Sequence, residues 1–463
     1  MSNFQLSNTI DSDKVFLVNL SEIEGRLDPH PYHKERKETI KKLEKIQCKP
    51  LRSVVMSNKV TTTDIDENDI YIGLENIVSN SGEYIKTNEK TSISSAAIFK
   101  KGQILFPKLR PYLNKVHLAL FNGLCSTEFH IYDVVGLIPK YLFIYLQSNL
   151  IVSQTKHLMT GNTLPRLQTE DINKLPVPIL SDEKQLEIIK KYDKAFNDKQ
   201  QKEAEAKNLL ASIDDYLLKE LGITLPEKNN SLKNRIFTTS IKDVSGGRFD
   251  PIFYSDNIQF LQKSKYQYKN LRECVTGFNS GFGIGKNEQD KNGDGIIQIR
   301  PTNIDNNGNL KFEKNILVPV EKVTDDNKLV YGDIIFNNTN SQDLVGKTAI
   351  FLSDIPVATY SNHITILKAK ENLVNSFYLK ELLNLFQHHK FFYSICTNWN
   401  NQSGIGNELL KKINIPLPPQ KKQIELAQHI SDIRAKAKQL EEEAKEILEK
   451  AKQEVEQIIL GEK

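Results

Sequence analysis

Two long segments of the chain place apolar residues at the spacing of a coiled coil. In residues 420–460, apolar side chains recur at the first and fourth positions of a seven-residue repeat. Residues 181–221 follow the same repeat less cleanly, with Lys199 and Glu203 forming a polar centre. Such a repeat forms one apolar stripe along a helix, and the stripe needs a partner. The pattern predicts two helices of about 40 residues, each roughly 60 Å long, that pack together as an antiparallel coiled coil. The alternative is that each helix packs on its own domain. The predicted contact residues are Ile189, Phe196, Leu210, Ile213, Leu217, Ile430, Ile433, Leu440 and Ile447.

The segments before each predicted helix alternate between short apolar runs and polar turns. Mostly apolar runs of strand length, separated by turns rich in Gly, Asn and Asp, occupy residues 70–72, 103–106, 296–299 and 334–336. Longer apolar runs that suit short helices occupy residues 141–150 and 377–385. This order of elements predicts an α+β fold with two mixed α/β domains separated by the two long helices.

Four motifs occur twice in the same order, once before each predicted long helix. Residues 26–29 read Arg-Leu-Asp-Pro, and residues 248–251 read Arg-Phe-Asp-Pro. The other matched pairs are residues 72–77 with 299–304, 102–106 with 332–336, and 175–178 with 415–418. A repeat kept in order indicates an internal duplication with pseudo-symmetric copies. The duplication predicts domains at residues 1–178 and 226–418 and long helices at residues 179–225 and 419–463.

The last of these motifs carries two prolines, which are Pro176 and Pro178 in the first copy and Pro416 and Pro418 in the second. Proline has no N–H to donate to a ladder or to a helix. We therefore predict rigid spacers that lead into the long helices, and not strands.

The overall composition is that of a multidomain globular protein. The chain has 463 residues, of which 39% are hydrophobic and 26% charged, and no apolar run approaches the about 18 residues of a membrane helix. The four cysteines lie far apart and are expected to be core residues of a protein in a reducing compartment. These features predict a cytoplasmic protein that does not enter a membrane. The net charge of +4 permits an anionic partner without requiring one.

Several fragments resemble ligand-binding motifs but lack an essential part. Gly346-Lys347-Thr348 ends like a phosphate-binding loop, but Ser341 stands where the first glycine belongs, so a strand turn is expected. Residues 290–295 mimic a calcium loop, but Pro301 replaces the glutamate at its twelfth position, so a plain turn is expected.

Histidines and aspartates near the repeated motif could suggest a metal site or an acid–base pair. His30 and His33 lie near Asp28, but no third ligand follows at useful spacing, so ordinary surface histidines are favoured, as at residues 388–389. Asp28 and Asp250 could act as an acid and a base, but a buried aspartate that pairs with its own arginine is favoured. We find no methyltransferase, nuclease or hydrolase motif, so the sequence predicts neither catalysis nor a cofactor or metal bound by this chain.

Each predicted domain gathers side chains that suit DNA. Lysine and arginine bind phosphates and guanine edges, while asparagine and glutamine match adenine edges. The candidates in the first domain are Lys108, Arg110, Lys115, Asn162, Thr163 and Arg166. The candidates in the second domain are Arg300, Asn338, Asn340, Gln342, Lys347, Asn400 and Gln402, with Trp399 nearby. For any single position, a solvated loop residue remains the alternative.

These motifs, taken in order, resemble the specificity subunit of type I restriction-modification systems over nearly the whole chain. The resemblance rests on the repeated Arg-x-Asp-Pro, on residues 164–167, 332–340 and 345–349, and on the Pro-x-Pro joints. It implies two target recognition domains, each reading one half of an interrupted DNA sequence, and helices that set the spacer and dock two methyltransferase subunits. It also implies that restriction subunits join the complex, and that S-adenosylmethionine, ATP and Mg are bound by the partners. Residues 106–111 lack the asparagine-rich strand end of the second domain, so the base-reading residues of the first domain stay open.

Two other functions remain open. The chain could be a fragment of a fused restriction-modification methyltransferase, although the missing catalytic motifs argue against that. It could also be a coiled-coil scaffold that binds no DNA, in which case its complex would show no salt-dependent DNA affinity.

Overall fold

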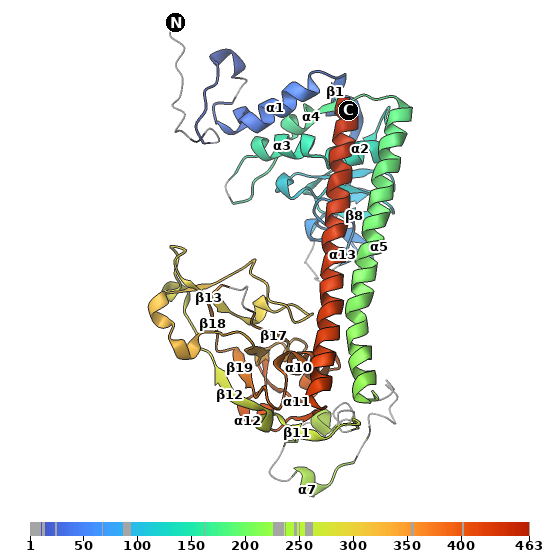
Figure 1. Ribbon diagram of the computed structural model, residues 1–463. Coiled ribbons are helices and arrows are strands. Elements are labelled where there is room, and N and C mark those ends of the chain that lie inside the picture. The colour runs from blue at the N-terminus through green and yellow to red at the C-terminus, as the bar shows by residue number, and fades with distance from the viewer. Residues whose placement is uncertain are drawn as a thin grey trace. The chain divides into compact units, whose positions relative to one another are not determined.

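The computed structural model divides the chain into two units, and the division falls inside both long helices (Figure 1). The first unit comprises Met1–Glu203 and Glu442–Lys463, and the second comprises Ala204–Glu441. The predicted domain boundaries, which follow the ends of the helices, stay predictions. The structure describes residues 11, 14–23, 26–66, 68–86, 94–161, 163–225, 236, 238–244, 248–249, 251–254, 263–352, 356–400 and 402–462.

The first unit is built around two four-stranded sheets, in the orders β2-β9-β6-β7 and β3-β5-β8-β4. Neighbouring strands are antiparallel except β4 and β8, which are parallel. Its strands are β1 (Cys48–Pro50), β2 (Val55–Asn58), β3 (Thr61–Thr62), β4 (Tyr71–Ile72), β5 (Ala96–Phe99), β6 (Ile104–Pro107), β7 (His117–Leu118), β8 (Gly123–Cys125), β9 (Phe129–Val134) and β10 (Pro176–Pro178). Its helices are α1 (Lys34–Leu43), α2 (Pro139–Leu146), α3 (Asn149–Leu158) and α4 (Thr169–Asn173).

The second unit has a four-stranded antiparallel sheet, β12-β19-β15-β17, and two three-stranded sheets, β14-β13-β18 and β16-β21-β20. Here β13 and β18 are parallel. Its strands are β11 (Tyr268–Asn270), β12 (Val275–Ser280), β13 (Ile296–Ile299), β14 (Leu317–Val318), β15 (Ile334–Asn337), β16 (Thr339–Asn340), β17 (Thr348–Ile350), β18 (Ala358–Tyr360), β19 (Ile364–Ala369), β20 (Thr397–Trp399), β21 (Gln402–Gly404) and β22 (Asn414–Pro416). Its helices are α7 (Ile241–Val244), α9 (Leu271–Cys274), α10 (Ser376–His388), α11 (Phe391–Ile395) and α12 (Asn407–Lys411).

These elements confirm a mixed α/β fold and most of the predicted segments. The apolar runs at residues 103–106 and 334–336 are β6 and β15, which are buried along their whole length because each lies inside a four-stranded sheet. The predicted helix at residues 141–150 is wrong at its end. The helix α2 stops at Leu146, and α3 begins at Asn149.

The first Pro-x-Pro motif is a strand, and Pro416 of the second is the last residue of another, so the prediction that these prolines cannot join a ladder is wrong. β10 pairs with β1, and β22 pairs with β11, both antiparallel. Leu51 N donates to Leu175 O (2.8 Å) and Ile179 N donates to Gln47 O (2.9 Å) on either side of β10. In an antiparallel ladder every second residue points its N–H away from the partner strand, and the prolines occupy those positions. The missing N–H therefore breaks no bond.

The same contact fastens the proline strand to the domain in each unit. In the first unit, the hydroxyl of Tyr141 on α2 donates to Pro178 O at 2.9 Å. In the second unit, the hydroxyl of Tyr378 on α10 donates to Pro416 O at 2.9 Å. Both tyrosines are fully buried and lie in the main apolar core of their unit.

The repeated Arg-x-Asp-Pro motif makes equivalent contacts in the two units. The hydroxyl of Tyr32 donates to Arg26 O, and that of Tyr254 donates to Arg248 O, both at 2.6 Å. The guanidinium of Arg26 donates to Leu158 O at 3.0 Å, and that of Arg248 donates to the carbonyls of residues 395 and 396. The motif therefore ties the start of each copy to the segment after its apolar helices.

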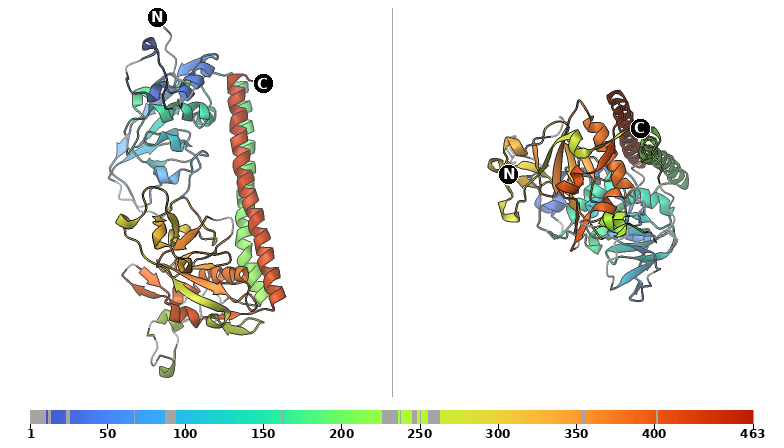
Figure 2. Two further views of the ribbon diagram at one scale, coloured as in Figure 1. Left: turned by 60° about the vertical axis from the view of Figure 1, so that its left-hand side comes forward. Right: turned by 90° about the horizontal axis from the view of Figure 1, so that it is seen from below.

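The long helices are α5 (Asp182–Leu221) and α13 (Gln420–Leu460). Their segments lie side by side within each unit (Figure 2). In the first unit, Lys191 pairs with Glu454, and Lys202 pairs with Glu443 at 2.6 Å. In the second unit, Lys422 Nζ lies 2.8 Å from Glu220.

The apolar stripe of α13 departs from the predicted heptad after residue 444. Ile430, Ala437 and Leu440 are buried as expected, but Ile447 is only half-buried while Leu448 is buried. A straight helix has 3.6 residues per turn, so a strict seven-residue repeat drifts around its surface. On α5, Ile213 and Leu217 are buried, whereas Ile189, Phe196 and Leu210 are partly buried and pack against the cores of their units.

Three of the cysteines, Cys125, Cys274 and Cys396, are buried, and Cys48 is partly buried, which confirms the prediction of core residues. Among the described residues, no helix is both long and apolar enough to cross a membrane.

Replacing Gly308 by alanine should destabilise the second unit. Gly308 has a φ of +72°, and an added Cβ would lie 2.4 Å from Asn384 Nδ2 and 2.5 Å from Thr348 O. The expected loss of unfolding free energy is about 2 to 4 kcal/mol. The matched control is Gly293→Ala, which has a φ of +94° but open space around the new methyl group. It should cost about 1 kcal/mol. Urea unfolding of both variants measures the difference, and equal losses would contradict the contact.

Candidate nucleic-acid interface

In the first unit, two short segments bring three of the candidate cations together. Leu167 N donates to Lys108 O, and Arg110 N donates to Pro165 O, both at 2.9 Å, so the segment after β6 pairs with residues 165–167. Thr160 and Arg166 exchange two main-chain hydrogen bonds of 2.9 Å and close the loop that carries Thr163. Thr163, Arg166 and Arg110 are exposed. Asn162 lies outside the described residues.

The charged groups of several of these candidates already have hydrogen-bond partners within the unit. Arg166 forms a two-bond pair with Glu128, at 2.8 and 3.1 Å, which raises the pKa of Arg166 and lowers that of Glu128. Lys108 donates to Thr127 O at 2.6 Å, and Lys115 donates to Leu74 O at 2.7 Å. Burial lowers the pKa of both lysines.

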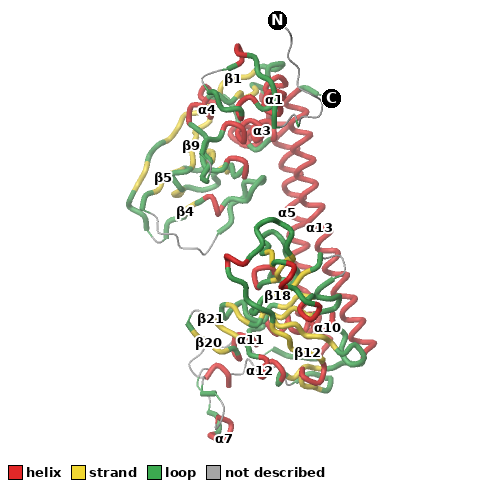
Figure 3. The backbone as a smooth tube through the Cα atoms, turned by 90° about the vertical axis from the view of Figure 1, so that its left-hand side faces the viewer, coloured by secondary structure: helices red, strands yellow, loops and turns green. Residues whose placement is uncertain are grey.

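In the second unit, the small sheet β16-β21-β20 gathers the candidate amides (Figure 3). Asn340 on β16 pairs with Ser403 on β21, and Gln402 pairs with Trp399 on β20. Trp399 is 47% exposed, and Gln402 and Asn400 are exposed beside it. The sheet therefore presents an indole and several amide groups to solvent.

Two of the candidates in this unit are buried and bind the protein itself. Asn338 donates to Thr365 Oγ1 (2.9 Å) and Asn362 O (3.3 Å), and its own carbonyl oxygen accepts from the Thr339 hydroxyl. Lys347 donates to Ile304 O at 2.5 Å, and burial lowers its pKa. Asn338 follows β15 and Lys347 precedes β17, two neighbouring strands whose residues are buried or partly buried. Their side chains are therefore buried and bonded within the unit, and whether they contact DNA stays a prediction.

The remaining candidates are intermediate. Gln342 donates to Tyr393 O at 3.1 Å, and Arg300 Nε lies 3.5 Å from Gln298 Oε1. Both are partly exposed, and burial lowers the pKa of Arg300. Whether any of the candidate residues contacts DNA stays a prediction.

The fragments that mimic ligand-binding loops are turns, as predicted. The carboxylate of Asp290 accepts from the main-chain N–H groups of Asn292, Gly293 and Gly295, at 2.9 to 3.3 Å. Gly346, with a φ of +92°, leads directly into β17. In each fragment the groups that a ligand would need are used by the turn itself.

The aspartate of the first Arg-x-Asp-Pro motif pairs with its own arginine, as predicted. Arg26 Nε donates to Asp28 Oδ2 at 2.8 Å, and a second arginine nitrogen reaches Asp171 at 3.2 Å. The Asp28 side chain is 40% exposed, so it is not the buried group that we expected. Asp250 lies outside the described residues.

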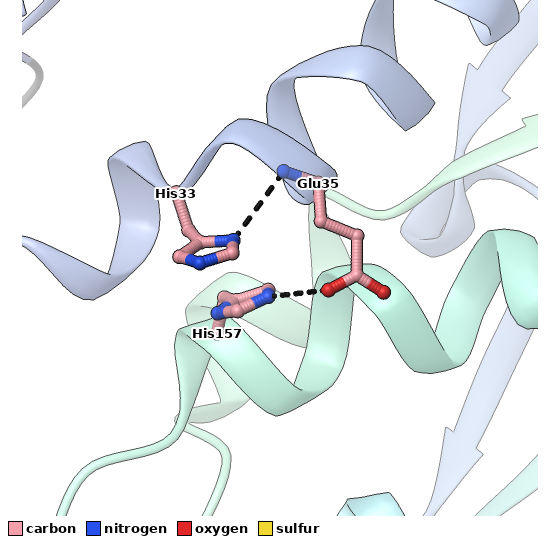
Figure 4. Close-up of side chains that lie close together, drawn as sticks. All are labelled: His33, Glu35 and His157. Atoms are coloured by element: carbon pink, nitrogen blue, oxygen red, sulfur yellow. Dashed lines mark hydrogen bonds and ion pairs between the residues drawn. The ribbon is translucent and has the colours of Figure 1, made fainter. Parts of the chain in front are cut away.

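His33 has two possible co-ligands nearby, which sequence spacing did not reveal (Figure 4). Ligand atoms of His33, Glu35 and His157 lie within 4.8 Å of one another, and His157 Nε2 lies 3.0 Å from Glu35 Oε2. The two imidazole rings are stacked, with centroids 4.1 Å apart and planes 14° from parallel. A metal bound by imidazole lies close to the ring plane, and one ion cannot lie in both of these planes. Lys156 also forms an ion pair with Glu35 at 2.7 Å. We therefore interpret the group as two stacked histidines beside an ion pair, and not as a metal site.

Comparison with known proteins identifies two related specificity subunits. No protein-family model matches the chain. It is 28% identical over 171 residues to the putative type I restriction enzyme MjaX specificity subunit of Methanocaldococcus jannaschii, covering 36% of this chain and 39% of that one. It is 30% identical over 118 residues to the type I restriction enzyme EcoDI specificity subunit of Escherichia coli, covering 25% and 26%. The resemblance inferred from the motifs is therefore confirmed, although the matches span less than half of either relative.

The solved structures that the chain resembles include one from a type I R-M system. A chain from a type I R-M system, described for its complex assembly and conformational transition, covers 89% of this chain and 96% of its own length. The TM-score is 0.50 and the identity 16%, so the likeness concerns the fold alone.

Buried and exposed candidates should behave differently when replaced. Asn338→Ala should lower the free energy of unfolding by about 1 to 3 kcal/mol, because it leaves buried partners without a hydrogen bond. Gln402→Ala should change it by less than about 0.5 kcal/mol, because its side chain is exposed. Urea unfolding of the two variants would test this, and a stable Asn338→Ala variant would contradict the structural role.

Proposed function

We propose that this chain is the non-catalytic DNA specificity subunit of a type I restriction-modification complex, and that each of its two units reads one half of a bipartite target. The observation that carries the proposal is a shared framework with different surfaces. The contacts of Tyr141 and Tyr32 recur at Tyr378 and Tyr254 with the same acceptors, whereas the segments after β6 and β15 differ. The two curated relatives, both specificity subunits, support the same function.

The different surfaces support an asymmetric target. The first unit presents the exposed Arg110 after β6, beside Arg166, which is paired with Glu128. Arginine suits phosphates and guanine. The second unit presents Asn340, Asn400 and Gln402 beside Trp399, which suit adenine edges and apolar base contacts. Since the two sets differ in chemistry, the two half-sites should differ in sequence.

The helices support a fixed distance between the half-sites. In the first unit, the partners of Lys191 and Lys202 are Glu454 and Glu443, so the residue numbers run in opposite directions. The second unit follows the same order. Glu220 pairs with Lys422, and the ring of Tyr216 lies 4.3 Å from that of His429 between centroids, with the planes tilted by 44°. This order supports the proposal of an antiparallel coiled coil between pseudo-symmetric target recognition domains. Two target recognition domains held by such a coiled coil would contact half-sites about one DNA turn, roughly 34 Å, apart.

The partners follow from the proposed role. Two methyltransferase subunits would dock on the helices, and restriction subunits would complete the complex in the cytoplasm. S-adenosylmethionine, ATP and Mg would be bound by those subunits.

The direct test is to map methylated adenines in a host that expresses this chain with its methyltransferase partner. We expect one bipartite, asymmetric motif that disappears when this chain is left out. Methylation or cleavage by this chain alone would favour the fused-enzyme alternative. A contiguous palindrome would overturn the two-reader proposal, and a complex without salt-dependent DNA affinity would favour the scaffold.

The double variant Asn340→Ala, Gln402→Ala should alter one half of the target only. Both amides lie on the same small sheet, where Gln402 is exposed and the partly exposed Asn340 accepts from Ser341 N at 2.8 Å. Their loss should relax recognition there by about tenfold or more at the affected bases. The matched control is Asn287→Ala, at an exposed amide outside that sheet. Sequencing the methylated sites measures both, and a change in both halves would contradict separate readers.

A further inference from the structure

In the first unit, the turn after the repeated Ile-x-x-x-Asn-Ile motif is built by one asparagine. Asn76 accepts a hydrogen bond from Gly73 N (2.8 Å) and donates one to Ile85 O (3.1 Å). The turn at residues 78–84 lies between these bonds and is closed by a bridge between Ile77 and Tyr84. It is a rigid feature of the domain, at the end of β4.

Buried lysines on both long helices bind this turn. Lys452 on α13 donates to Asn80 O at 2.5 Å, and Lys199 on α5 lies 2.6 Å from the carboxylate of Glu83. Lys199 and Lys452 are 7% and 5% exposed. Lys199 also pairs with Glu203 at 2.8 Å, so its charge is balanced by two carboxylates. Gln200, the residue after Lys199, also donates to Glu83 at 3.2 Å, so both long helices bind the turn.

In the second unit, Asn303 builds the equivalent turn. It accepts from Arg300 N (2.9 Å) and donates to Lys311 O (2.8 Å), on either side of the turn at residues 305–309. Arg434 on α13 donates to Asn307 O at 2.6 Å.

Arg434 is held in place by a buried acid on the domain. Its guanidinium forms two hydrogen bonds with Glu381 on α10, at 2.7 and 2.9 Å. Burial opposes ionisation of Glu381, but Lys380 and Arg434 outweigh it and lower the pKa of Glu381. The arginine therefore connects α13 to the apolar helix and to the turn at once.

The helix α5 reaches the second turn through a histidine. Asp214 on α5 lies 2.9 Å from His388 Nδ1, and His388 Nε2 lies 3.0 Å from Asn306 O. His388 closes α10, so the contact joins three elements of the unit. As in the first unit, the turn is gripped from both long helices.

We propose that Lys199, Lys452, Arg434 and the pair Asp214–His388 are positioning residues that fix the orientation of each reader on the helix segments of its own unit. The proposal rests on the proposed function, because it assigns these residues a part in setting the distance between half-sites. In both units the turn is bonded to both long helices, but different side chains form the bonds. Contacts that were only inherited from a duplicated ancestor would be expected to keep the same side chains.

Charged groups suit this position because their hydrogen bonds are directional. A buried ion pair adds little stability over apolar residues of the same volume, because removing charges from water is costly. Apolar contacts, however, allow packed elements to slide, whereas a hydrogen bond to one carbonyl fixes both distance and angle. We call these contacts of Lys199, Lys452, Arg434 and the pair Asp214–His388 the clamp. The clamp therefore determines the orientation of each domain on its helix segments more than it determines the stability of the unit.

The test uses Lys452→Met in the complete complex with its methyltransferase partner. Methionine keeps the apolar stem and removes the ammonium group. The substrates carry the native half-sites with a spacer that is shortened or lengthened by one base pair. We expect the variant to methylate the altered spacers about tenfold better, relative to the native spacer, than the wild-type complex does. The half-site sequences should not change. Lys450→Met, at an exposed lysine of α13, is the matched control.

A second measurement does not depend on DNA. Hydrogen exchange of the Gly82 and Ile85 amides, which are bonded inside the turn, should be about tenfold faster in Lys452→Met than in Lys450→Met. If the wild-type complex methylates no bipartite target, the proposed function fails, and the exchange rates still decide whether the clamp exists. Arg434→Lys, which keeps the charge near Glu381 but loses the planar fork, gives the same test in the second unit. Unchanged spacer preference together with unchanged exchange would overturn the proposal.

Discussion

One buried glutamine in each unit holds a long helix to its domain. Gln185, in the first turn of α5, accepts from Ile138 N (2.9 Å) and donates to Leu180 O (2.9 Å). Gln423 of α13 accepts from Asn375 N (2.8 Å) and donates to Pro418 O (2.8 Å). Each side chain satisfies main-chain groups at the start of the apolar helix and at the end of the proline strand. These groups would otherwise be buried without partners, which is costly.

The rest of each unit depends on where this joint places the helix. The proline strand is paired on one side and receives a tyrosine hydroxyl from the apolar helix on the other. The glutamine lies where the strand meets the long helix, so the strand, the apolar helix and the long helix meet at one point. Most of these bonds are accepted or donated by the main chain. A framework of this kind tolerates changes in the side chains of the surface loops, which explains how the two copies can differ there and keep one fold.

The sequence was sufficient where a pattern depends on local geometry. Heptad spacing located both long helices to within a residue, because an apolar stripe can be read directly from the chain. Buried β6 and β15 were found for the same reason, as continuous apolar runs. The proline strands were missed because their tolerance depends on which N–H groups face the partner strand. That register is set by β1 and β11, which are more than a hundred residues away in the chain.

The candidate site was less predictable because burial of a polar side chain depends on distant partners. Asn338 and Lys347 have the composition of a DNA-binding surface, but Thr365 and Ile304 O bind them in the interior. The joining of β16 to β21 and β20 brings together segments about sixty residues apart, and no local signal marks it. The clamp contacts were missed for the same reason, since Lys452 and Asn80 are separated by most of the chain.

The first unit includes the end of α13, which is the last part of the chain to be synthesised. This has a consequence for the order of folding. The core of the first unit contains Leu448, Val455 and Ile459, which are synthesised after the whole second unit. At about 5 to 20 residues per second, the first unit would wait tens of seconds on the ribosome with part of its apolar core uncovered. The second unit, Ala204–Glu441, receives its last residue only 22 residues before the chain ends, which is about 1 to 4 seconds at the same rate. The unit whose synthesis begins first therefore cannot complete its core before the unit whose synthesis begins second.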